Sequence, residues 1–240
     1  MKRFLFLLSI LMVLTFGLTV TAFAQIEFIE SEKPGTEDEP VMADSNEPFG
    51  DRKVSPEFKA IVADLAGKGK ISTADGDFYY LYDFSDEWPQ LYWYQWTQRS
   101  SVVVNNFVVR AKIRYESASQ TPNWADSGCG WWFRGEGPET HLIAYYTLEG
   151  NGQVSGALNK NYLSYGKKKV GSPAVKGEVE MVLYVDGPKI GLLINGIPAI
   201  DRSDLVIDNL PSMLHSVTLS GTNKDFGIRC EYSDVEFMVF

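Results

Sequence analysis

A strict alternation of apolar and polar residues at positions 106–115 most constrains how this chain can fold. Every second residue of NFVVRAKIRY, from Phe107 to Tyr115, is apolar, and the positions between them include Arg110, Lys112 and Arg114. Successive side chains of a β-strand point to opposite faces, so the segment predicts a strand with one buried face and one wet face.

Short apolar segments of similar character follow along the rest of the chain. We expect further strands at 78–84, 91–97, 130–134, 141–148, 152–158, 178–185, 191–194, 197–200, 216–220, 227–232 and 235–239. Asn195-Gly196 stands between two apolar runs and is a strong signal for a two-residue hairpin. About ten short strands with almost no helix predict one all-β, two-sheet antiparallel sandwich over residues 70–240.

Residues 1–24 have the composition of a signal peptide. Two basic residues precede an almost wholly apolar run at 4–20, and Ala22-Phe23-Ala24 has the small-x-small pattern of a cleavage site. We therefore expect cleavage after this pattern and a secreted or otherwise extracytoplasmic protein. The alternative is an uncleaved membrane anchor, because the run is long enough to approach a membrane span.

The segment at 25–54 is rich in Glu, Asp, Pro, Ser and Gly and lacks periodic apolar residues. Such a segment buries too little surface to offset its ordering entropy, so we expect a disordered acidic spacer, with an interaction tail as the alternative. The formal net charge is −9, and residues 25–57 contribute −7 of it with ten acids and three bases. The acidity therefore belongs mostly to a tail, and nothing is basic enough to favour a nucleic-acid partner.

A short helix is expected at 55–67. Ser55 is a good N-cap, Pro56 suits the first helical position and Gly67 can end the helix. An apolar stripe recurs at i, i+3, i+4 and i+7, namely Phe58, Ile61, Val62 and Leu65. We expect this helix to pack against the edge of the domain, without a chemical role.

The two cysteines of the chain are Cys129 and Cys230. An oxidising compartment would let them pair and close a loop of about 100 residues, which stabilises by roughly 4–5 kcal/mol in the chain-entropy model. The alternative is two buried free thiols.

No metal or cofactor is expected. The two cysteines and the distant His141 and His215 have no spacing typical of a metal site. Asp75-Gly76-Asp77 lacks the spacing of a calcium loop, so a plain turn is the interpretation and calcium an unsupported alternative.

Four segments together carry a resemblance to a known fold family: 106–134, which ends in SGCGWWFR, 140–154, 179–200 and 221–240. They resemble the concanavalin A-like lectin/glucanase jelly rolls, and look closest to exported bacterial domains of the laminin-G-like and 3-keto-disaccharide hydrolase type. Ser127, Gly128, Phe133 and Arg134 are comparable to an SG-x-x-FR-like strand of those domains, with a longer spacing. The resemblance covers about residues 71–240 and implies a jelly-roll sandwich, but the fold hosts many functions.

The sequence has neither the Glu-x-Asp-x-x-Glu nor the Glu-x-Asp-x-Glu catalytic signature that glucanases of the resembled family carry. The nearest pair, Glu178 and Glu180, lies on the outward alternation of an ordinary strand, where carboxylates are usually just solvated. No convincing Ser-His-Asp set is present, and we interpret His141 and His215 as structural. The sequence therefore suggests no catalytic residue.

Aromatic residues exceed what one buried face needs. In GCGWWFR, alternation places Trp131 and Phe133 on the same face as Cys129, so we expect both in the core. Trp132 and Arg134 fall on the opposite face, together with Gly128 and Gly130. Glycines leave room for a ligand, a Trp offers a flat surface to a sugar ring, and Arg offers fixed donors.

Further ligand-binding candidates come from two other segments. Tyr92, Tyr94 and Trp96 share one face of the strand at 91–97, which is either covered by the helix or a crossing loop, lines a groove, or pairs at a dimer edge. Trp124 in a loop either binds ligand or closes the end of the core.

Three functions are compatible with these features. The first is a secreted, non-catalytic module that binds a glycan or another surface ligand. The second is a sugar-active enzyme of the 3-keto-disaccharide hydrolase type, with Arg134, Arg229 and Glu231 as its polar groups, although an Arg–Glu pair on a sheet is usually an ion pair. The third is a structural or adhesive cell-surface protein. A glycan is the expected partner, with a cell-surface protein as the alternative and no membrane contact after signal cleavage.

Overall fold

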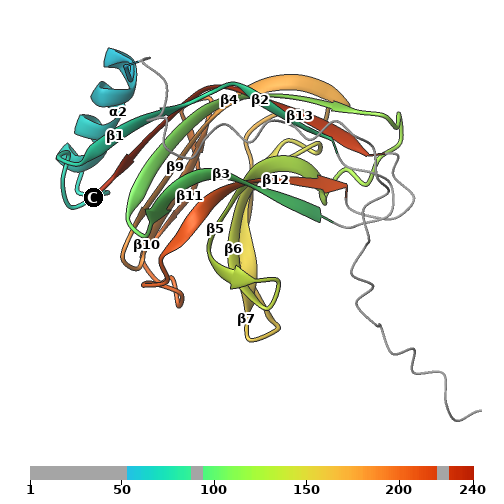
Figure 1. Cartoon of the computed structure of the whole chain (residues 1–240). Helices are drawn as coiled ribbons and strands as arrows, with labels where there is room; N and C mark the ends of the chain where they lie inside the picture. The colour runs from blue at the N-terminus through green and yellow to red at the C-terminus, as the bar shows by residue number, and fades with distance from the viewer. Residues whose placement is uncertain (1–52, 88–93, 221–226) are drawn as a thin grey trace, which may run out of the picture. The chain divides into compact units, whose positions relative to one another are not determined.

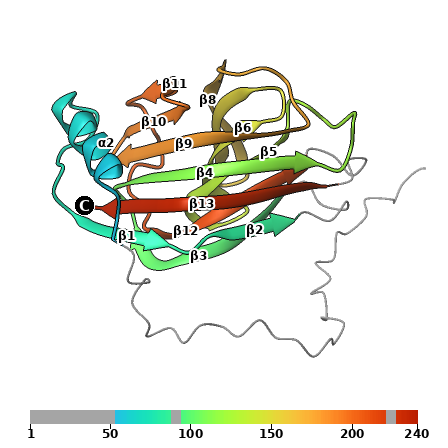
Figure 2. The same cartoon turned by 90° about the horizontal axis from the view of Figure 1, so that it is seen from above.

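Two antiparallel sheets lie face to face in the computed structural model, which describes residues 53–87, 94–220 and 227–240 (Figures 1 and 2). The signal peptide and nearly all of the spacer that the sequence predicts, together with Tyr92, lie outside the described residues. In the described ranges, no helix is long and apolar enough to cross a membrane.

The first sheet, sheet A, has seven strands. They are, in spatial order, β1 (Asp77–Leu81), β13 (Ile228–Val239), β4 (Phe107–Ser117), β9 (Lys176–Asp186), β10 (Lys189–Ile194) and β11 (Ile197–Arg202), with β2 (Phe84–Glu87) paired beside β1 on β13. Sheet B has six strands, β3 (Tyr94–Val104), β12 (Ser212–Ser220), β5 (Ser127–Gly137), β6 (Thr140–Thr147), β7 (Asn151–Leu158) and β8 (Asn161–Lys169). The predicted two-sheet antiparallel sandwich is confirmed.

The core lies between the two sheets and follows the predicted alternation. The apolar face of β4 packs against Trp131 and Phe133 of β5, which are fully buried. Cys129 and Cys230 form a disulfide that joins β5 of sheet B to β13 of sheet A. The predicted pairing is therefore confirmed, and the free-thiol alternative is wrong.

The structure divides or joins the predicted strands differently in two places, and it contains one strand that was not predicted. The predicted strand at 78–84 is divided into β1 and β2, which both pair with β13. The two strands predicted at 227–239 are one continuous β13 with a register shift between Ser233 and Glu236, where Asp234 has a φ of 50°. The edge strand β8 was not predicted, because most of its side chains are exposed and Lys167–Lys169 break any apolar alternation.

The helix α2 (Pro56–Gly67) begins after Ser55, whose side chain accepts a hydrogen bond from the backbone N–H of Phe58, as predicted. Its stripe packs on the outer face of sheet A, against Val108, Val182 and Met238. The helix therefore covers part of a sheet face rather than only the edge of the domain. It does not cover Trp96, which belongs to sheet B.

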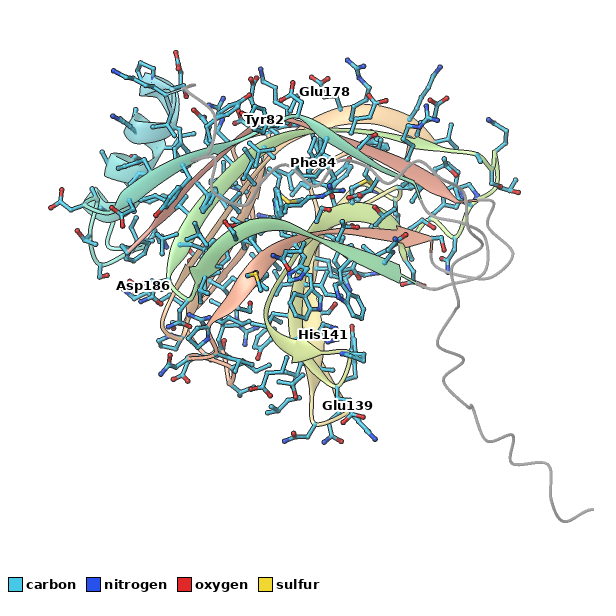
Figure 3. The ribbon with its side chains drawn as sticks, in the orientation of Figure 1. Tyr82, Phe84, Glu139, His141, Glu178 and Asp186 are labelled. Atoms are coloured by element: carbon cyan, nitrogen blue, oxygen red, sulfur yellow. A yellow bond between two sulfur atoms is a disulfide. The ribbon has the colours of Figure 1, made fainter. Side chains whose placement is uncertain are left out.

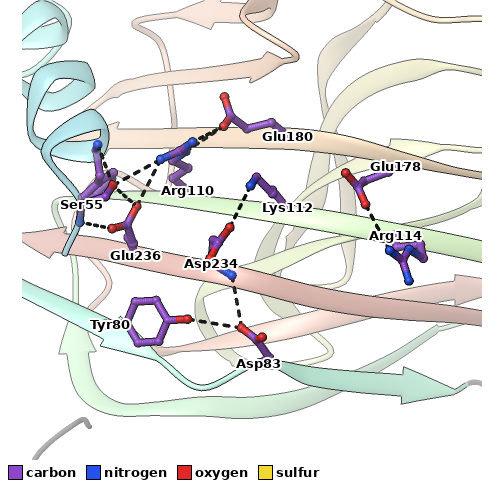
Figure 4. A network of polar contacts seen from close by, with 11 residues as sticks. Ser55, Tyr80, Asp83, Arg110, Lys112, Arg114, Glu178, Glu180, Asp234 and Glu236 are labelled. Atoms are coloured by element: carbon purple, nitrogen blue, oxygen red, sulfur yellow. Dashed lines mark hydrogen bonds and ion pairs between the residues drawn. The ribbon is translucent and has the colours of Figure 1, made fainter. Parts of the chain in front are cut away.

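A polar network fixes the N-terminal end of α2 to sheet A (Figure 4). The buried carboxylate of Glu236 accepts hydrogen bonds from the backbone and hydroxyl of Ser55, and pairs with Arg110 at 3.3 Å. Arg110 also pairs with Glu180 at 2.6 Å. The N-cap residue of the helix is thus tied to β13 through Glu236 and, through Arg110, to β4 and β9.

Candidate functional site

The outer face of sheet B, which points away from sheet A, brings together residues from distant parts of the chain. Residues paired across neighbouring strands share a face, and Trp132 of β5 pairs with His215 of β12 and with Ile143 of β6. Trp96 of β3 pairs with Val217 of β12 on the same face. The candidates Trp96 and Trp132 therefore lie on one surface.

Four rings form a contiguous group on this face, which we call the Trp–His cluster: Trp96, Trp132, His141 and His215. Trp96 stacks on Trp132 with ring centroids 5.8 Å apart and an interplanar angle of 12°. Trp132 also stacks on His141 at 6.0 Å and meets His215 edge-to-face at 4.6 Å. Figure 3 shows His141 among the side chains of sheet B on the side away from sheet A.

The sequence-based interpretation took the two histidines of the cluster as structural and did not place them beside Trp132. Alternation along 141–147 places His141 with Ile143 and Tyr145, opposite the core residues Leu142 and Ala144. That signal was present, but the cross-strand pairing that sets both imidazoles against Trp132 depends on strand order. Strand order is not visible in the periodicity of a single segment.

The glycines beside Trp132 have a different role from the one expected. A Cβ built at Gly130 would overlap the carbonyl oxygen of Ala144, and one at Gly128 would overlap that of Tyr146. These glycines therefore let β6 approach β5 closely, rather than leaving room for a ligand. A Cβ at Gly135 would overlap the indole of Trp132, so the ring lies directly over the Gly135 backbone.

The centre of the cluster is sheltered, whereas its margins are open. Trp132 is 3% exposed, while Trp96 and His215 are partly buried and Gln98 is exposed. Among the described residues, none accepts a hydrogen bond from the indole N–H of Trp132. A buried donor left without an acceptor is costly, and the indole N–H of the core residue Trp131 lacks one as well. The position of Trp132 on the outer face is what makes its N–H a candidate to bind a ligand oxygen.

Both imidazoles are held neutral at ordinary pH. Nδ1 of His215 lies 2.9 Å from the carbonyl oxygen of Met213, and Nδ1 of His141 lies 3.2 Å from that of Gly137. Burial lowers the pKa of both side chains below the ordinary histidine value.

Polar groups continue from the cluster across β6, β7 and β8. Burial raises the pKa of the Tyr145 hydroxyl, which hydrogen-bonds to Ser155. Tyr145 pairs with Gln153, which in turn pairs with Lys167 on β8. Within the described strands of sheet B, the paired positions that face outward carry no Asp or Glu, so these positions supply no pair of carboxylates for hydrolysis.

Arg134 does not lie where the alternation placed it. Its φ is 45°, and the pairing of β5 with β6 shifts register after Phe133, so the strand turns the side chain away from the outer face. The guanidinium is fully buried and uses all five N–H donors on the oxygens of Asn105, Asn106, Gly187 and Ile207. Its donors are unavailable to a ligand, so Arg134 leaves the candidate set.

Two other aromatic candidates are placed differently. Trp124 is partly buried and packs against the main core, as expected of a residue that closes its end. Tyr94 begins β3, but its side chain lies outside the described residues, as does the whole of Tyr92. Both tyrosines stay predictions.

Arg229 and Glu231 lie on the outer face of sheet A, so both sheets separate them from the Trp–His cluster on the outer face of sheet B. They help line a hollow of about 370 Å³, together with Arg114 and Glu178. Arg114 pairs with Glu231 at 3.4 Å and with Glu178 at 3.7 Å. Each of the carboxylates considered for catalysis thus contacts an arginine, and Glu180 contacts Arg110.

The described ranges contain no group of three or more His, Cys, Asp or Glu side chains able to hold an ion. The side chain of Thr73 accepts a hydrogen bond from the backbone N–H of Asp75, which is the geometry of a turn.

No protein-family model matches the sequence, and a search of curated proteins finds no match either. Solved structures do match. The carbohydrate binding module CBM66 from Bacillus subtilis matches with a TM-score of 0.50 at 9% identity, over 67% of this chain and 94% of that one. The A. japonicus protein CB05 matches with a TM-score of 0.50 at 12% identity, over 72% of this chain and 27% of that one.

At these identities the matches show the fold alone, and the narrower likeness to laminin-G-like or 3-keto-disaccharide hydrolase domains stays a prediction. The strand order, the two antiparallel sheets and the structural matches agree with the family that the sequence resembles. The chain has a concanavalin A-like lectin/glucanase jelly-roll fold.

Proposed function

We propose that the protein is an exported, non-catalytic carbohydrate-binding module and that the glycan binds on the outer face of sheet B. The observation that carries this proposal is the Trp–His cluster, in which a sheltered indole N–H lacks an acceptor among the described residues. Aromatic faces pack against the apolar faces of sugar rings, and nearby polar groups bind the hydroxyls.

Three further observations support the proposal. The fold matches that of a carbohydrate binding module. The outward paired positions of sheet B that the structure describes hold no carboxylate, which favours binding over hydrolysis. The disulfide between Cys129 and Cys230 is typical of proteins in oxidising compartments, which supports export.

Calorimetric titration of the whole chain with a panel of soluble polysaccharides and oligosaccharides tests the proposal. Trp96→Ala should weaken binding about threefold to tenfold, because it removes one face of the stack while Trp96 is only partly buried. Tyr82→Ala is the matched control, because Tyr82 is 69% exposed and lies between β1 and β2 of sheet A (Figure 3). If no glycan binds, or if both variants weaken binding equally, the proposed site is wrong.

A second candidate function belongs to the hollow on sheet A. Glu178 and Glu231 both contact Arg114 there, so two carboxylates lie around one concave surface, as a glycosidase requires. Turnover of a keto-glycoside or polysaccharide that is abolished in Glu231→Gln would favour this function. Turnover that persists in Glu231→Gln would exclude Glu231 as its catalytic group.

A further inference from the structure

The imidazole of His215 presents an acceptor to the outer face of sheet B. Its Nδ1 lies 2.9 Å from the backbone oxygen of Met213, and a carbonyl oxygen only accepts hydrogen bonds. Nδ1 therefore carries the proton, and in the neutral ring Nε2 holds a lone pair. The ring is half buried and meets the indole of Trp132 edge-to-face at 4.6 Å.

Trp132 supplies the complementary donor. Its indole N–H is buried and has no acceptor among the described residues. A hydroxyl group both donates and accepts, so an indole donor next to an imidazole acceptor matches the hydroxyl groups of a sugar. An anionic group, which only accepts, would match Trp132 but would meet the lone pair of Nε2.

The charged groups around this pair do not favour an anion. In the described strands, the outward paired positions next to His215 are occupied by Gln98 on β3 and Trp132 on β5. The further titratable groups at the paired positions of this face are His141 and Tyr145 on β6, and Tyr162, Lys167 and Lys169 on β8. The carboxylate of Asp126, which precedes β5, also interacts electrostatically with Tyr145 and adds a negative charge. Both lysines are engaged by Glu149, since Lys167 lies 3.9 Å from its carboxylate and Lys169 donates to its backbone oxygen.

We propose that Trp132 and His215 recognise hydroxyl groups of a neutral glycan, and that the site releases this glycan when His215 becomes protonated. This inference rests on the proposed function and adds the ligand class and the control by pH. Protonation converts Nε2 from an acceptor into a donor, so the O–H of the bound hydroxyl loses its acceptor and must turn away before its oxygen can accept from Nε2–H. Because burial lowers the pKa of His215, the acceptor form prevails near pH 7 and is lost on acidification.

Isothermal titration of the whole chain at pH 7.5 and pH 5 tests the inference, with neutral gluco-, manno-, galacto-, xylo- and fructo-oligosaccharides and with oligogalacturonides as anionic probes. We expect a neutral oligosaccharide to bind more tightly than the uronides at pH 7.5. Its affinity should fall about threefold to tenfold at pH 5, as expected for one lost hydrogen bond. In His215→Gln, which keeps an acceptor oxygen but does not titrate, the affinity should no longer change between the two pH values.

His141→Gln is the matched control, because the pKa of His141 is also lowered, while its ring comes from β6 and stacks on Trp132 instead of meeting it edge-to-face as His215 does. The pH dependence should persist in this variant. Near-UV circular dichroism must accompany each titration, because the unfolded chain binds more protons than the folded chain below the ordinary histidine pKa, and stability therefore falls as the pH drops.

Two sets of results would overturn the inference. Tighter binding of uronides, affinity that rises or stays constant at pH 5 in the folded wild type, or pH dependence that survives in His215→Gln would refute it and leave the proposed function intact. Absence of binding to every probe at both pH values would refute both.

Discussion

Arg134, which the alternation of the sequence places on the outer face of its strand, is a fully buried structural residue. Its guanidinium binds the turn between β3 and β4 at Asn105 and Asn106, the turn between β9 and β10 at Gly187, and the loop at Ile207. Burial lowers its pKa from 12.5 to about 10, so the cation is costly to bury and depends on these carbonyl oxygens. Arg134 therefore acts as a cross-link between three connections of the sandwich.

Arg134→Lys should destabilise the protein by about 2–4 kcal/mol, because an ammonium has three donors and leaves buried carbonyl oxygens unpaired. Urea denaturation followed by tryptophan fluorescence measures the change. Arg202→Lys is the control, since Arg202 is exposed and pairs with Asp204, and it should stay within about 0.5 kcal/mol of wild type. Equal stability of both variants would show that the network at Arg134 contributes little.

At the scale of elements, α2 depends on its N-cap residue, Ser55, as much as on its apolar stripe. Ser55 caps the helix through Phe58 and also donates from its hydroxyl to Glu236 at 2.9 Å. Glu236 is 3% exposed, so its carboxylate relies on Ser55 and Arg110 for hydrogen bonds. One serine thus joins helix initiation to helix docking (Figure 4).

Ser55→Ala should lower the free energy of unfolding by about 1–2 kcal/mol, because both the cap and a partner of a buried carboxylate are lost. Amide hydrogen exchange should show the loss first in α2 and only weakly in sheet B. Ser203→Ala, at an exposed position between β11 and β12, should leave exchange unchanged. Protection of α2 that is the same in both variants would contradict the role of Ser55.

The strands also show which features the sequence can predict. Alternation correctly separated Trp131 and Phe133, which are core, from Trp132, because facing depends only on neighbouring residues. It failed at Arg134, because a register shift changes facing and leaves no mark in composition. It also could not show that Trp96, His141 and His215 surround Trp132, since that requires the order β3-β12-β5-β6.

At the scale of the whole molecule, the two sheets are joined covalently at a single described position. The disulfide between Cys129 and Cys230 links β5 to β13 across the core, and its cysteines are 101 positions apart in the sequence. A cross-link of this span restricts the unfolded chain far more than the folded one. The disulfide therefore links sheet B covalently to sheet A, on whose outer face α2 packs.

Cys129→Ala with Cys230→Ala should cost about 4–5 kcal/mol of stability, because the unfolded chain regains the entropy of a loop of about 100 residues. The same loss should follow when wild type is denatured in urea with a strong reductant, and reductant should not affect the double variant. Since a domain is typically stable by about 5–15 kcal/mol, such a loss would leave the reduced protein marginal. If wild type were equally stable with and without reductant, the fold would not require an oxidising compartment. The disulfide would then no longer support export.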